Sequence, residues 1–171
     1  ALADGDYYAA AEGEGPHRGL ALARRMALLG YRSPDELNLR FDRSWQSSRS
    51  PLGEGGRFAV ESYLDFHGNK FTRRFDANSY IALVTAMSSH DVGRDRGGVE
   101  AALASVTMPT LVLAIDSDRL FPVADQERVA AGVPGNLDGD RPHLIASEYG
   151  HDAFLIESTL VGAQLERLLS Q

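Results

Sequence analysis

Two side chains that can do acid–base chemistry follow short apolar runs in the last third of the chain. Asp118 comes soon after the run 111–115, and His151 follows the run 143–146. Continuous apolar runs bounded by turn residues are typical of strands buried on both faces of a parallel sheet. Functional residues of open α/β sheets collect just beyond the carboxyl ends of the strands. Because neighbouring strands lie about 4.8 Å apart, we expect Asp118 and His151 to meet.

A carboxylate beside an imidazole can hold one tautomer of the histidine and stabilise its protonated form, so that the histidine takes a proton from a hydroxyl. Either residue alone also fits a plainer role, as a turn former, a helix cap or an incidental loop residue. Asp116 competes with Asp118 for the acid position, and Asp152 directly follows His151. The residues by themselves leave these choices open.

The nucleophile that such a pair would serve is absent from the sequence. The order acid, then histidine matches α/β-hydrolases, in which a serine on a G-x-S-x-G turn comes first. No serine here has glycine at both the second position before it and the second position after it. The chain also has no cysteine, which excludes a thiol nucleophile, disulfides and thiolate zinc sites. We therefore expect the nucleophile to lie upstream of this sequence.

The elements that must position these residues are predicted from hydrophobic periodicity and breakers. We expect helices over 17–30, 34–39, 58–67, 76–89, 99–105, 124–131 and 153–169, and strands over 111–115 and 143–146. Alternating strands and helices predict an α/β fold with a parallel sheet. Two parallel strands cannot bury both faces alone, so we expect them to be the edge of a larger sheet.

Composition narrows the function further. The 171 residues carry 17 basic and 24 acidic side chains, a formal net charge of −7, and 43% are hydrophobic. This content supports a packed core, and the acidic balance argues against a nucleic-acid or anionic-membrane surface. No apolar run approaches the ~20 residues of a membrane span. The histidines lack metal-ligand spacing, so we predict no metal site.

Several longer stretches resemble one enzyme family. Together they are similar to the C-terminal half of the homoserine O-acetyltransferases of the α/β-hydrolase superfamily, from residue 5 to the C-terminus and more weakly over 43–56. The matching stretches are GDYY (5–8), RGLALARRMALLGYRSP (18–34), FAVESYLDFHGNKFTRRFDANSYIALVTAM (58–87), HDVGRDRGGVEAAL (90–103), IDSDRLFP (115–122) and YGHDAFLIE (149–157).

The resemblance implies a two-part organisation. Residues 1–98 would form a mostly helical lid, and residues 99–171 the last parallel strands and helices of the α/β-hydrolase domain. The N-terminal half, with the nucleophile elbow, would be missing from this sequence. The resemblance further implies a cytoplasmic homodimer joined through lid helices.

The implied reaction moves an acetyl group from acetyl-CoA, a co-substrate, to the hydroxyl of L-homoserine in methionine biosynthesis. It would follow a ping-pong Ser-His-Asp mechanism without a permanently bound cofactor. Asp118 and His151 would be catalytic. Arg24 and Tyr31 would bind the homoserine substrate, and Asp152 would hold its ammonium group. The family places an arginine at the Arg24 position on the substrate carboxylate, a role that suits a guanidinium.

Other interpretations remain open from the sequence. Without the resemblance, Arg24 would be assigned to a solvated helix face, and it shares a face with Tyr31 only if the helix continues past Gly30. Succinyl transfer, or serine as acceptor, would use the same triad. The chain could also be a non-catalytic module, and without the nucleophile we expect the isolated chain to be inactive.

Overall fold

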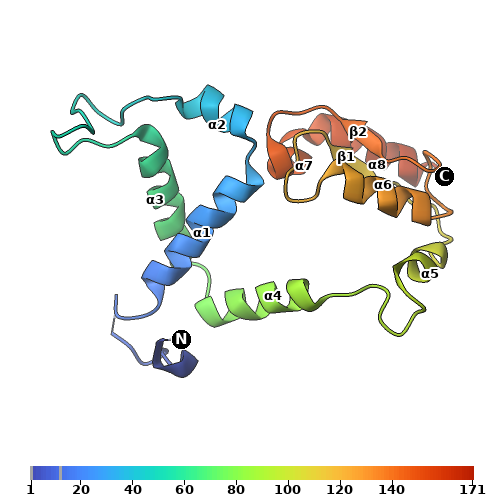
Figure 1. Ribbon diagram of the computed structural model, residues 1–171, viewed down its shortest axis with the longest axis horizontal. Helices are drawn as coiled ribbons and strands as arrows, with labels where there is room; N and C mark the ends of the chain where they lie inside the picture. Colours follow the sequence, from blue (N-terminus) through green and yellow to red (C-terminus); the bar gives the residue numbers. More distant parts are fainter. Residues whose placement is uncertain (1, 12) are drawn as a thin grey trace. The chain divides into compact units, whose positions relative to one another are not determined.

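The computed structural model describes residues 2–11 and 13–171, which form two compact units (Figure 1). The first unit comprises Ala1–Leu29 and Leu39–His90, and the second comprises Gly30–Asn38 and Asp91–Gln171. The chain thus leaves the first unit briefly, contributes a short corner to the second, and returns. The expected division into a lid (1–98) and a hydrolase segment (99–171) stays a prediction.

The first unit is helical. Its elements are η1 (Leu2–Gly5), α1 (His17–Tyr31), α3 (Ala59–Thr72) and α4 (Ala77–Ser89), and α2 (Pro34–Phe41) begins in the second unit. Leu20, Ala21 and Leu28 of α1 are buried, as is Phe71 of α3. The helices approach closely at Gly68, where a Cβ atom would lie 2.9 Å from the carbonyl oxygen of Ala21.

The start of α4 anchors the N-terminal segment. The Asp76 side chain caps the helix by accepting a hydrogen bond from the N–H of Ser79 at 2.7 Å. The Tyr7 hydroxyl donates to the same carboxylate and accepts from the N–H groups of Ala77 and Asn78. The hydrogen bond from Tyr7 lowers the pKa of the Asp76 carboxyl. Tyr7 and Asp76 together therefore connect the N-terminal segment to the start of α4.

The second unit has an α/β arrangement. Its elements are α5 (Val99–Ala104), β1 (Leu113–Ile115), α6 (Val123–Gly132), β2 (His143–Ile145), η2 (Gly150–Asp152), α7 (Ala153–Ile156) and α8 (Ser158–Leu169). The two strands are parallel, with Leu113 opposite His143 and Ile115 opposite Ile145. Figure 1 shows α6 and α8 beside them. Ile115 and Ile145 form a core cluster with Ala153, against which Val161 packs.

Most element bounds differ from the sequence prediction by one or two residues, and α3 ends at Thr72 and not at residue 67. Two further differences have a cause in the contacts. The first strand begins at Leu113 and not at 111, because the N–H of Val112 donates to the Asn136 side chain. The predicted helix over 153–169 is broken at Glu157, whose ψ of 47° leaves the helical region. The Glu157 carboxylate there accepts a hydrogen bond from the Ser147 hydroxyl at 2.9 Å, a contact to an earlier loop that periodicity cannot register.

Large apolar side chains lie exposed in both units. In the first unit they include Leu22, Met26, Leu29, Ile81, Leu83, Val84 and Met87, and in the second they include Leu144, Phe154, Leu155, Leu160 and Leu165. The stripe of α1 that indicated a helix therefore faces solvent, whereas Leu20, Ala21 and Leu28 pack inward. Parallel sheets are normally covered on both faces, so the exposed apolar surface of the second unit fits the expected edge of a larger sheet.

Candidate acid–base site

Side-chain hydrogen bonds join the loops that follow β1 and β2. The N–H of Ser147 donates to Oδ1 of Asp116 at 2.9 Å. The Ser117 hydroxyl donates to the carbonyl of Ser147 and accepts from the N–H of Gly150 at 3.0 Å. Asp116 is thus occupied with holding the two loops together. The two loops follow the carboxyl ends of neighbouring strands, and these hydrogen bonds connect them into one layer at that edge of the sheet.

This layer brings Asp118 to His151. Oδ2 of Asp118 lies 2.9 Å from Nδ1 of His151. Oδ1 accepts hydrogen bonds from the backbone N–H groups of Leu120 at 2.8 Å and Phe121 at 3.0 Å. The aspartate side chain is 7% exposed and the histidine side chain 22%. Both oxygens of the carboxylate are therefore engaged.

The arrangement suits general acid–base chemistry. With its proton on Nδ1, His151 donates to the Asp118 carboxylate, and Nε2 becomes the nitrogen that accepts a proton from a reacting hydroxyl. The buried carboxylate then stabilises the imidazolium that forms.

A hollow of about 180 Å³ adjoins the pair, and its lining includes Asp118, His151, Phe121, Phe154 and Ile145. The Phe121 ring meets the His151 ring edge-on, with centroids 5.0 Å apart, and the Phe154 ring lies 5.5 Å away. Small-molecule sites usually measure about 300–1,000 Å³. This hollow is therefore smaller than a typical small-molecule site.

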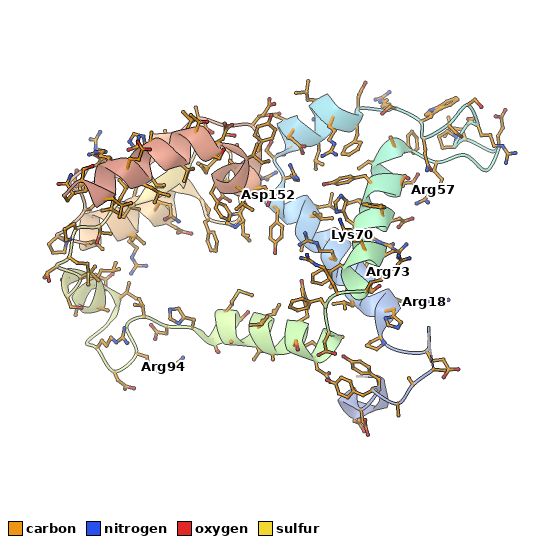
Figure 2. All side chains as sticks on the ribbon, turned by 180° about the vertical axis from the view of Figure 1, so that it is seen from behind. Arg18, Arg57, Lys70, Arg73, Arg94 and Asp152 are labelled. Carbon is orange, nitrogen blue, oxygen red and sulfur yellow. The ribbon has the colours of Figure 1, made fainter. Side chains whose placement is uncertain are left out.

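Two of the residues predicted to bind substrate lie next to the pair. The Tyr31 ring centroid is 5.7 Å from that of His151. Asp152 follows His151 directly, where α7 begins (Figure 2). Its Oδ2 atom lies 3.1 Å from Nε of Arg32, an ion pair that the sequence did not indicate.

The corner between α1 and α2, residues 31–34, packs against the loop that carries His151 (the histidine loop). The buried Ser33 hydroxyl donates to the carbonyl of Glu148 and accepts from the N–H of Glu36 at 3.0 Å. Gly150 has φ +63°, and a Cβ atom there would lie 2.6 Å from the carbonyl oxygen of Tyr31. Only glycine allows the backbone of the corner to approach this closely.

Arg24, the fifth predicted site residue, belongs to the first unit. Its guanidinium carbon lies 5.3 Å from the centroid of the Phe71 ring, within the range of a cation–π contact. Together with His67, Lys70 and Arg74 it lines a hollow of about 180 Å³. Three cationic side chains at one hollow suit an anionic group, which is compatible with the carboxylate role that the resemblance implies.

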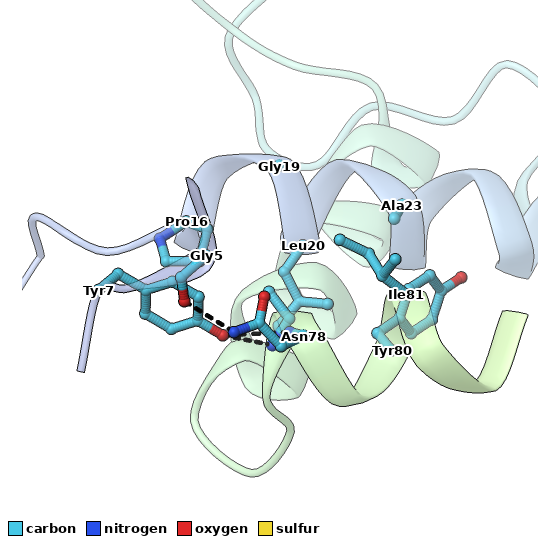
Figure 3. A pocket seen from close by; sticks show the side chains of 10 residues that line it. Gly5, Tyr7, Pro16, Gly19, Leu20, Ala23, Asn78, Tyr80 and Ile81 are labelled. Atoms are coloured by element: carbon cyan, nitrogen blue, oxygen red, sulfur yellow. Dashed lines mark hydrogen bonds between the residues drawn. The ribbon is translucent and has the colours of Figure 1, made fainter. Parts of the chain in front are cut away.

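A larger hollow of about 280 Å³ lies between α1 and α4 in the first unit (Figure 3). Leu20, Ala23 and Ile81 line it with apolar surface, and Tyr7 and Asn78 close one end through hydrogen bonds. The residues that line it include no acid–base pair.

Sequence reasoning missed the residues that hold the site together. The pattern S-P-D-E over 33–36 is a capping-box signature with proline at the first helical position, and it could have identified Ser33 as a helix cap. The contact between Arg32 and Asp152 had no such signal, because the two residues are distant in sequence.

Within the described part of the chain, no three histidine, aspartate or glutamate side chains gather in a group that could hold a metal ion. None of the helices there combines the length and the apolar character that crossing a membrane requires.

Comparison with curated proteins finds relatives along nearly the whole chain. The sequence is 73% identical over 169 residues to a homoserine O-acetyltransferase of Clavibacter michiganensis, covering 99% of this chain and 43% of that protein. A homoserine O-acetyltransferase of Leifsonia xyli is 66% identical over 166 residues, and one of Thermobifida fusca 48% over 167. The chain thus spans well under half the length of these relatives. No family profile matches it.

Solved structures show the same fold. A homoserine O-acetyltransferase from Bacillus anthracis is similar with a TM-score of 0.73 at 19% identity, over 94% of this chain and 43% of that one. The esterase E22 is similar with a TM-score of 0.70 at 20% identity, over 92% and 43%. These likenesses confirm the predicted fold class, the C-terminal part of an α/β-hydrolase fold with additional helices.

Proposed function

We propose that this chain, which is 73% identical over nearly its whole length to a homoserine O-acetyltransferase, supplies the acid, the base and part of the acceptor site of such an enzyme. The single observation that carries this proposal is the contact between Asp118 and His151, which has the order and geometry that hydroxyl activation needs. The identity of 73% to a named homoserine O-acetyltransferase supports the same reaction. We also propose that the enzyme acts in methionine biosynthesis and is located in the cytoplasm.

The proposed reaction has two half-reactions that use His151 in the same way. A serine hydroxyl outside this chain gives its proton to Nε2 of His151, and its oxygen attacks the thioester carbonyl of acetyl-CoA. The C–S bond breaks, and His151 returns the proton to the CoA thiolate. In the second half, the homoserine hydroxyl gives its proton to His151 and attacks the acetyl-serine. O-acetylhomoserine leaves, and the serine regains its proton.

The acceptor is held by charge complementarity in this proposal. Asp152 takes the ammonium group, and its position directly after His151 supports this role. Arg24 takes the carboxylate by two parallel hydrogen bonds, and Tyr31 lines the acceptor path beside the histidine ring. No metal or permanently bound cofactor takes part in these steps.

The donor and the acceptor are tested together. The full-length enzyme is offered acetyl-CoA or succinyl-CoA, each with L-homoserine or L-serine, and the product is identified by mass. We expect O-acetylhomoserine as the main product. O-succinylhomoserine or O-acetylserine as the main product would support a same-fold enzyme of different specificity, and no acylated product at all would contradict the proposal.

A second candidate, a non-catalytic module, rests on the missing nucleophile. The 171-residue chain alone has the pair but no serine elbow, and we expect it to transfer no acetyl group. Transfer by the isolated chain that is abolished by His151→Ala would show that it carries its own nucleophile.

The enzyme is also proposed to be a homodimer joined through lid helices. The exposed apolar side chains of α1 and α4 support this, because large exposed apolar patches mark interaction surfaces.

A further inference from the structure

The guanidinium of Arg32 lies between two carboxylates. Its Nε atom is 3.1 Å from Oδ2 of Asp152, and its Nη1 atom is 3.4 Å from Oε1 of Glu36. The side chains of Arg32, Asp152 and Glu36 are 16%, 22% and 7% exposed. Contacts between largely buried charges are screened little by solvent, so each partner restrains the orientation of the others.

Such restraint matters for Asp152. The terminal torsion of an aspartate is broad and roughly two-fold, so an unrestrained carboxylate turns easily. The ion pair between Oδ2 and the guanidinium restrains this torsion by charge attraction and leaves Oδ1 for a further donor. A carboxylate that is already oriented binds an ammonium without paying the entropy of fixing a side chain.

Arg32 itself is fixed on both sides along the chain. Tyr31 before it packs against the His151 ring, and Ser33 after it donates to the Glu148 carbonyl. The arginine therefore has a fixed position relative to the acid–base pair, which a flexible surface arginine would lack.

We propose that Arg32 is a positioning residue that orients Asp152 toward the ammonium group of the acceptor, and that Glu36 braces Arg32 from the other side. This inference rests on the proposed function, because it gives Asp152 the acceptor amine. It adds that recognition of an amino-acid acceptor depends on a residue that does not touch the acceptor. The first half-reaction, which involves no amine, is independent of Arg32.

The test separates the two half-reactions in the full-length enzyme. The variant Arg32→Gln is mixed with acetyl-CoA alone, and the burst of CoA thiol reports formation of the acetyl-enzyme. The KM for L-homoserine and kcat are then measured at steady state. We expect an unchanged burst and a KM raised about tenfold, the cost typical of fixing a mobile side chain on binding. Arg32→Lys keeps the charge but loses the fork geometry, so its KM falls between these values.

The matched control is Arg128→Gln, which removes an exposed guanidinium paired with Glu100 and leaves both measurements unchanged. Thermal unfolding of each variant checks the fold. A normal homoserine KM in Arg32→Gln, or in a folded Arg32→Lys if the glutamine variant does not fold, overturns the inference. So does a burst that slows as much as KM rises, because that result means general damage to the pair. If the unmodified enzyme gives no burst, the proposed function itself fails.

Discussion

Asp118 is held by three partners, His151 and two backbone N–H groups, so its carboxylate has one orientation. Asp116 is two residues away and similarly placed after the strand, but it binds the N–H of Ser147. At the scale of single residues, the proposed acid is thus distinguished from its neighbour by contacts alone.

This difference gives a first prediction. In the full-length enzyme, Asp118→Asn removes the carboxylate that holds the histidine tautomer, and kcat falls by about 10³-fold or more. Asp116→Asn keeps an oxygen acceptor for Ser147 and serves as the matched control, with a far smaller loss. His151→Ala abolishes transfer. Steady-state acetyl transfer measures all three, and equal losses in the two aspartate variants would be evidence against Asp118 as the acid.

A second prediction concerns the acceptor carboxylate. Arg24→Ala raises the homoserine KM with a smaller effect on kcat, because it removes binding of a group that does not react. The neighbouring Arg25 forms an ion pair with Asp65 at 3.0 Å, so Arg25→Ala is the control for loss of a guanidinium from the same helix. A raised KM in the Arg25 variant alone would reverse the assignment.

At the scale of elements, the corner between α1 and α2 is bound to the histidine loop through Gly150. Gly150→Ala places a methyl group against the carbonyl oxygen of Tyr31, in addition to the strain of a positive φ. We expect it to destabilise the protein by about 1–3 kcal/mol and to raise the homoserine KM as Tyr31 and Arg32 shift.

Gly139 provides the control, because its φ is +71° but a Cβ atom there would meet nothing within 4 Å. Gly139→Ala therefore reports the backbone strain without the overlap. Denaturant unfolding of both variants gives the difference. If the two variants are equally stable and bind homoserine equally, the corner does not depend on close approach at Gly150.

Another contact between elements ties the loop after α6 to α8. The Arg167 guanidinium forms an ion pair with Asp138, and this hydrogen bonding lowers the pKa of the Asp138 carboxyl. A carboxyl whose pKa is lower in the folded state stabilises the fold above its unfolded pKa of about 3.9, and loses that contribution as the pH falls through the folded value.

Asp138→Asn should therefore be less stable than the unmodified protein near neutral pH, with a difference that shrinks on acidification below about pH 4. Urea unfolding at several pH values measures this difference. Asp140→Asn in the same loop is an exposed control and should follow the unmodified protein. A stability difference for Asp138→Asn that is constant with pH would mean that the ion pair is not its source.

At the scale of the whole molecule, the exposed apolar residues of α1 and α4 form a surface of the kind that mediates association. The proposed dimer predicts that Met26→Glu combined with Met87→Glu yields a folded monomer of the full-length enzyme, since buried charge opposes association. Light scattering after size-exclusion chromatography measures the mass. Leu169→Glu, at an exposed residue near the C-terminus, is the control. An unchanged dimer in the double variant would place the interface elsewhere.

Much of this protein was predictable from local patterns. Helical spacing, breakers and caps indicated α1, α4 and α6 to within a few residues, because such signals act within a few turns of the chain. The rule that loops beyond parallel strands carry function placed Asp118 and His151 together, and the motifs identified the family.

Contacts between distant segments decided the rest. Asp118 contacts His151 in the loop after β2, whereas Asp116 binds the N–H of Ser147. The break at Glu157 follows a bond to Ser147, and the orientation of Asp152 follows its pairing with Arg32. The sequence by itself determined which residue types stand where, and so the fold class and the family. Only the tertiary structure decided which charges pair, since pairing depends on distances that no local pattern encodes.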